Sequence, residues 1–173
     1  MSVLARLLRF RPDPREELRP LWHRIVSVSR TERWYLEGGV ADSVGGRFDM
    51  IATLLALVLL RMERAGAEAQ SQVFLTELFV EDMDRQLRES GVGDLVVGKR
   101  LGKLVSVLGG RLGAFREALA ADAGEDSLPA AVARNITMAD GRDPAPLAAM
   151  LRDYARELEA LSAPQILSGE IPG

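Results

Sequence analysis

Apolar side chains recur at the 3.6-residue spacing of a helix along most of the chain. They do not alternate with polar side chains over the length of a strand, and Gly- or Pro-containing turns separate the periodic stretches. The pattern predicts an all-α fold, a single-domain irregular bundle of about six to seven helices around a central apolar helix. The predicted helices cover residues 15–29, 47–64, 67–90, 97–120, 128–138 and 143–161.

The predicted helix over residues 47–64 is apolar on every side between Met50 and Leu60. This run of eleven residues falls well below the ~20 that a membrane-spanning helix needs. We therefore expect this helix to lie at the centre of the bundle. The preceding stretch, residues 34–46, holds two Gly-Gly pairs and is predicted to be a loop with room for one turn of helix.

The predicted helix over residues 97–120 carries three stripes. One is apolar and has the width of a core-facing surface. The second gathers small residues; because glycine inside a helix costs roughly 1 kcal/mol relative to alanine, we expect them to allow close approach of another backbone. The third is basic and is either a solvated face or a site for phosphates of RNA or lipid. The small stripe comprises Gly98, Gly102, Ser106, Gly109 and Gly113, and the basic stripe comprises Lys99, Arg100, Lys103 and Arg111.

The two ends of the chain differ from the predicted helical domain, residues 15–162. Residues 1–14 form a short basic arm whose apolar and arginine positions fall on opposite sides of a helix, which favours contact with an anionic membrane surface. Residues 163–173 are predicted to be a flexible tail. The candidate membrane-surface residues are Leu4, Arg6, Leu7, Leu8, Arg9 and Phe10.

The amino-acid composition excludes several kinds of catalytic and metal site. Cysteine is absent and His23 is the only histidine, which excludes disulfides, thiolate nucleophiles and zinc sites built on several imidazoles. The net charge of −3 conceals a basic block at residues 1–34, an acidic block at 68–96 and a basic block at 97–116. The first eleven residues lack the apolar run of an export signal, so we expect a cytoplasmic chain that associates peripherally with the inner membrane.

Two motifs with catalytic potential have simpler explanations. The stretch from Gly93 to Arg100 matches the phosphate-binding GxxxxGK pattern, but Arg100 stands in place of the Ser or Thr, and a helix precedes it rather than a strand. An acidic cluster at Glu81, Asp82 and Asp84 is typical of a solvated helix face, and no nucleophile accompanies it. We therefore predict no catalytic residues, no cofactor and no metal site.

Several blocks in sequence order resemble the ubiquinol-cytochrome c chaperone family, in its alphaproteobacterial branch. They span roughly residues 20–120, and such an ordered set is more specific than any single motif above. The blocks are Gly46-Arg47-Phe48-Asp49-Met50, Phe79-Val80-Glu81-Asp82-Met83-Asp84, Leu87-Arg88-Glu89, Gly91-Val92-Gly93-Asp94-Leu95 and Val97-Gly98-Lys99-Arg100.

The resemblance implies a helical, non-enzymatic assembly factor. Its client would be newly synthesised cytochrome b, and its product the assembled ubiquinol-cytochrome c reductase complex. The resemblance adds the ribosome as a further candidate partner and leaves a small partner subunit unidentified. Carried over residue by residue, the candidate client-binding residues are Arg47, Phe48, Asp49, Asp82, Asp84, Arg88, Gly93, Asp94, Gly98, Lys99, Arg100, Gly102 and Lys103.

The main alternative function is a ribosome- or RNA-associated translation factor that uses the basic helix face. Aromatic residues make up only 5% of the chain, and none is interleaved with the basic stripe to stack on bases. We therefore expect no sequence-specific nucleic-acid binding, and the alternative rests on charge alone.

Overall fold

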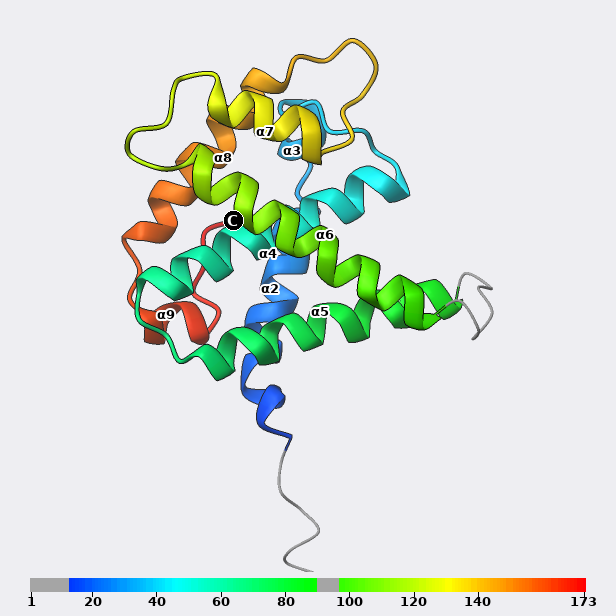
Figure 1. Ribbon diagram of the computed structural model, residues 1–173, viewed down its shortest axis with the longest axis vertical. Helices are drawn as coiled ribbons and strands as arrows, with labels where there is room; N and C mark the ends of the chain where they lie inside the picture. The colour runs from blue at the N-terminus through cyan, green and yellow to red at the C-terminus, as the bar shows by residue number, and fades with distance from the viewer. Residues whose placement is uncertain (1–12, 90–96) are drawn as a thin grey trace, which may run out of the picture.

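The central helix of the fold is α4, Val44–Arg64, whose middle is buried on all sides. The computed structural model describes residues 13–89 and 97–173. In this part of the chain the elements are helices, and the one strand-like feature is an isolated antiparallel bridge between Val40 and Met138. The predicted all-α fold is thus confirmed (Figure 1).

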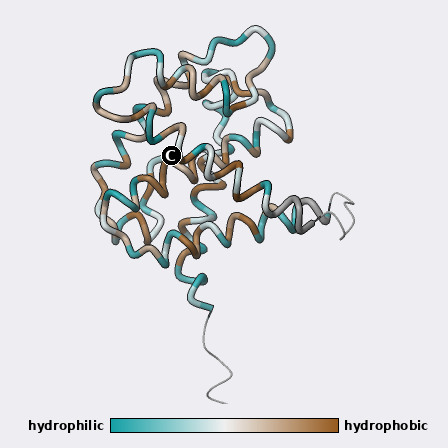
Figure 2. The backbone as a smooth tube through the Cα atoms, in the orientation of Figure 1, coloured by the Kyte–Doolittle hydropathy of each residue, from teal (hydrophilic) through white to brown (hydrophobic). Residues whose placement is uncertain are grey.

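The remaining helices surround α4. The one-turn helix α3 (Arg33–Leu36) lies at the start of the predicted loop, for which one turn of helix was allowed, whereas the short helix α9 (Ala163–Leu167) falls in the predicted flexible tail. Figure 2 shows apolar positions gathered in the middle of the molecule, with hydrophilic positions on the outer loops. Within the described residues, no helix is both long and apolar enough to cross a bilayer. The other elements are η1 (Pro14–Leu18), α2 (Arg19–Ser29), α3 (Arg33–Leu36), α5 (Ala69–Glu89), α6 (Val97–Ala118), α7 (Ser127–Asn135), α8 (Pro144–Glu159) and α9 (Ala163–Leu167).

The start of α4 corrects the predicted loop over residues 34–46. The Ser43 side chain accepts a hydrogen bond from the backbone N–H of Gly46 at 3.1 Å and caps the helix, which begins at Val44, three residues before its predicted start. Gly46 lies where the Ala41 carbonyl approaches the helix so closely that a Cβ atom would overlap it. Two glycines of the Gly-rich stretch, Gly45 and Gly46, therefore belong to the helix, and Gly46 permits this contact.

The C-terminal segment also differs from its prediction as a flexible tail. The side chains of Ile166 and Ile171 are buried in the core. Arg24 on α2 donates a hydrogen bond to the Ile171 carbonyl at 3.3 Å, and Gly169 takes a positive φ of 87° beside Leu21. Leu167 also packs against the core, so burial of three apolar side chains holds the segment against the rest of the domain.

The helices α5 and α6 determine the shape of one side of the molecule. They approach one another where α5 ends and α6 begins, and they diverge toward their other ends (Figure 1). Both pack on α4. The first turns of α4 lie close to the end of α5 and the first half of α6. This arrangement leaves a cleft between the three helices.

Candidate functional site

An apolar cleft lies between the start of α4, the end of α5 and the first half of α6. Its volume is about 550 Å³. The side chains at its apolar surface come from all three helices, and arginines stand at its rim. Val44, in the first turn of α4, is 89% exposed and extends the apolar surface outward. The lining residues are Arg30, Val44, Gly45, Arg47, Phe48, Ile51, Met83, Gln86 and Leu104.

Two of the predicted client-binding residues, Arg47 and Phe48, line this cleft. The Phe48 ring is partly buried, with its centroid 6.2 Å from that of Phe79. The guanidinium of Arg111 lies 5.7 Å from the centre of the same ring. Phe48 therefore contributes one part of its ring to the core and the other part to the cleft.

Beneath Phe48, the third residue of the predicted run, Asp49, belongs to a buried polar network. Asp49 is only 9% exposed and forms an ion pair with Arg111, which is 5% exposed. Thr137 donates to the other carboxylate oxygen of Asp49 through its backbone N–H at 2.9 Å and its hydroxyl at 2.7 Å. Arg111 also donates to the Asn135 carbonyl. The network ties α4 to α6 and to the segment after α7.

This network changes the interpretation of two residues. Burial lowers the pKa of Arg111, and the neighbouring carboxylate of Asp49 opposes that shift. The sequence pattern placed Arg111 on a basic stripe of α6. The structure shows instead that Arg111 is buried and paired with Asp49. Asp49 holds the fold below the cleft and presents little surface to a client.

Arg47 forms an exposed ion pair at the cleft rim. Its Nε donates to Asp42 at 2.7 Å, and both side chains are more than half exposed. The hydrogen bond from Arg47 lowers the pKa of the Asp42 carboxyl below its usual value.

We expect Arg47→Ala to return the pKa of Asp42 to its usual range, because the substitution removes the hydrogen bond that lowers it. The pKa of Asp42 is lower in the folded state than in the unfolded state. The pair therefore stabilises the protein at pH values above the usual aspartate pKa, and this stabilisation is lost as the pH falls through the folded-state pKa. A pH titration of the carboxyl carbon by NMR measures the shift. The interpretation fails if the pKa of Asp42 is the same in both proteins. Since the pair is exposed, the thermal midpoint should change little.

The acidic candidates lie outside the cleft. Asp82 faces α2, beside His23, and pairs with Arg85 one turn along α5; the Gln86 amide also donates to it at 3.3 Å. Asp84 is half-buried. Within the described ranges, no three acidic or histidine side chains are arranged to hold a metal ion.

The small-residue flank of α6 is open. A Cβ atom added at Gly102, Gly109 or Gly113 would have nothing within 4 Å. The backbone neighbour that the sequence pattern predicted is therefore not supplied by the described part of this chain. Lys103 is exposed beside this flank, and Val105 is half exposed.

Several predicted residues cannot be placed in the site. For one group, the structure describes the helical backbone but not the side chain. A second group falls outside the described residues altogether. The first group is Arg88, Gly98, Lys99 and Arg100, and the second is Gly93, Asp94, Leu4, Arg6, Leu7, Leu8, Arg9 and Phe10.

The sequence-based prediction included only Arg47 and Phe48 of the nine residues that line the cleft. Four of the missed residues are apolar: Val44, Ile51, Met83 and Leu104. Leu104 and Ile51 were assigned to the core, to which they also belong. Val44 carried the clearest signal, as a single apolar residue beside two glycines just before the central helix. Their proximity depends on how three helices cross, which periodicity does not specify.

Comparison with known proteins gives two findings. The model of a protein family described as ubiquinol-cytochrome C chaperone matches residues 36–172. The structure is similar to the crystal structure of the Cbp3 homolog from Brucella abortus, with a TM-score of 0.74 and 29% sequence identity over 98% of this chain and 95% of that chain. A search of curated proteins gives no match.

Proposed function

Because the chain belongs to the ubiquinol-cytochrome C chaperone family, we propose that it binds newly made cytochrome b and promotes assembly of the ubiquinol-cytochrome c reductase complex, without catalysing a reaction. The observation that carries the proposal is the apolar cleft between α4, α5 and α6. The whole cleft except Arg30 lies within the residues that the family model matches.

The cleft suits an apolar helix of a membrane-protein client. Phe48, Met83 and Leu104 offer side chains of different shape around one hollow, and Met adapts readily to different partners. Val44 keeps its apolar side chain in water in the isolated protein, which is an unfavourable exposure that a bound apolar client would relieve. Arg30 at the rim would meet the carbonyl end of such a helix favourably.

We further propose that the open flank of α6, with Gly102 and Lys103, extends the client-binding surface. Glycines without neighbours allow a second helix to approach closely, and Lys103 provides charge beside it. The surface runs from the cleft along the same helix, because Leu104 lines the cleft. Contact of the arm at residues 1–14 with anionic lipid would keep the protein near its client.

No described feature favours the RNA-associated alternative. Of the four residues in the basic stripe, Arg111 is buried in an ion pair and only Lys103 has a described exposed side chain. A groove for single-stranded RNA needs several exposed cations and aromatic platforms. Charge on α6 alone does not supply these.

The cleft is tested by placing a charge in it without disturbing the fold. Val44→Glu suits this purpose because the side chain is 89% exposed and an acidic residue in the first helical turn is favourable. In cells that lack the native copy, we expect this variant to lower the amount of assembled complex several-fold, since client binding would then require burial of a carboxylate. The ubiquinol-cytochrome c reductase activity of the membranes measures the assembled complex.

Leu36→Glu is the matched control, because Leu36 is also exposed, at 67%, and lies outside the cleft. It should support assembly as the wild type does. Equal losses in both variants, at equal protein levels, would point to a general effect of added charge and against the cleft. Full assembly with Val44→Glu and with Val44→Glu/Leu104→Glu would exclude the cleft as the client site.

A further inference from the structure

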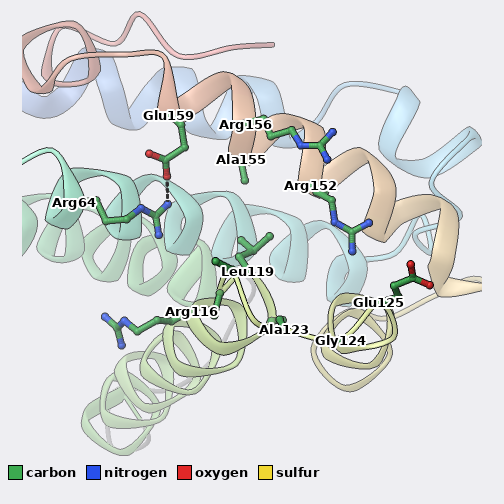
Figure 3. Close-up of a pocket in the computed structure, with 13 residues that line it drawn as sticks. Arg64, Arg116, Leu119, Ala123, Gly124, Glu125, Arg152, Ala155, Arg156 and Glu159 are labelled. Atoms are coloured by element: carbon green, nitrogen blue, oxygen red, sulfur yellow. Dashed lines mark ion pairs between the residues drawn. The ribbon is translucent and has the colours of Figure 1, made fainter.

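A second, larger cavity lies at the opposite end of α4 from the cleft. It has a volume of about 1060 Å³ and is bounded by the last turns of α4 and α6, the loop before α7, and α8 (Figure 3). Small side chains leave it open, because alanines at positions 118, 120, 121, 123 and 155 form much of its wall. Leu119 adds an apolar surface.

The wall of the cavity carries more positive than negative side chains. Four arginines and two glutamates line the cavity, a surplus of two positive charges. Arg64 pairs with Glu159, and Arg116 pairs with Glu63 at 2.7 Å. The carbonyl ends of α4 and α6 also stabilise these two arginines. The positive charge of this part of the wall is therefore largely compensated.

The positive charges of Arg152 and Arg156 are less fully neutralised than those of Arg64 and Arg116. They lie four residues apart on α8, so their guanidinium groups occupy the same side of the helix, where like charges repel (Figure 3). Arg156 has an exposed pair with Asp153 at 3.1 Å. Arg152 is half-buried and forms no ion pair with any described residue, and the middle of α8 provides no helix end to stabilise it.

We propose that this cavity binds a phosphate group, held by Arg152 and Arg156. A phosphate between the two guanidiniums would convert their repulsion into charge-assisted hydrogen bonds, for which the planar fork of arginine is well suited. Leu119 and Ala155 provide an apolar surface for the part of the ligand that carries the phosphate. The group belongs either to a soluble phosphate compound or to the headgroup of an anionic phospholipid. The proposal is independent of client binding at the cleft.

The test measures binding of two probes to the full-length protein. Inorganic pyrophosphate, titrated by calorimetry, represents a soluble ligand; vesicles of phosphatidylcholine with phosphatidylglycerol, measured by co-sedimentation, represent a headgroup. We expect Arg152→Gln/Arg156→Gln to weaken binding of one probe by roughly tenfold or more, through loss of two charge-assisted contacts. Ala155→Leu, which fills the cavity without changing charge, should do the same.

Arg134→Gln is the matched control, because Arg134 is an exposed arginine near the end of α7 that does not line the cavity. Every variant keeps residues 1–12 and must show the helical circular dichroism of the wild type. Loss of pyrophosphate binding in the cavity variants alone assigns a soluble ligand, and loss of vesicle binding alone assigns a headgroup. The proposal is overturned if neither probe binds, if Arg134→Gln weakens binding equally, or if Ala155→Leu leaves it unchanged.

Discussion

Asp49→Ala should lower the free energy of unfolding by about 3–5 kcal/mol, the range for removing one partner of a buried ion pair. The substitution leaves the Arg111 guanidinium, 5% exposed, without its carboxylate. It also removes the acceptor of two hydrogen bonds from Thr137. Unfolding by urea, followed by circular dichroism, measures the change.

Two further variants separate the buried charge from other effects of the substitution. Asp49→Ala/Arg111→Met removes both charges and should recover a large part of the lost stability, because no uncompensated charge remains. Asp42→Ala removes an exposed partner of Arg47 and should have little effect. The account of the network is wrong if Asp49→Ala is no more destabilising than Asp42→Ala.

Gly46→Ala should destabilise the protein by about 3 kcal/mol, near the upper end of the range for overpacked sites. The new methyl group would overlap the Ala41 carbonyl, and a backbone atom cannot move aside as a side chain can. Glycine to alanine inside a helix normally stabilises, by up to about 1 kcal/mol. The sign of the effect is therefore diagnostic of the close approach.

Gly110→Ala provides the comparison, because Gly110 is also helical and a Cβ atom there has nothing within 4 Å. It should raise the free energy of unfolding by up to about 1 kcal/mol. Denaturation curves of the two variants should shift in opposite directions. A stabilising effect of Gly46→Ala would contradict the geometry at the start of α4.

Hydrophobic periodicity was sufficient to predict the fold class and the central helix. The run from Met50 to Leu60 is apolar on every side, and a helix of that kind is stable only when other helices cover it. Periodicity failed at Gly46 and at residues 163–173. In both places the structure depends on contacts with segments distant in sequence, namely the Ala41 carbonyl and the surface of α2.

The candidate site was only partly predictable. The family resemblance selected Arg47 and Phe48, which line the cleft, but it also selected Asp49, which lies inside the fold. Sequence spacing placed Arg111 on a basic stripe. Spacing cannot reveal that Arg111 donates a hydrogen bond to the carboxylate of Asp49, 62 positions earlier in the chain. Such pairings depend on the packing of α6 against α4.

The central claim is that this chain binds newly made cytochrome b through its apolar cleft. The most direct measurement is recovery of pulse-labelled cytochrome b after cross-linking in native cells, with tagged wild type and tagged Val44→Glu compared at equal expression. The account predicts that the wild type recovers cytochrome b and that the variant, with unchanged circular dichroism, recovers several-fold less. Recovery of ribosomes or RNA without cytochrome b, equally by both proteins, would contradict it.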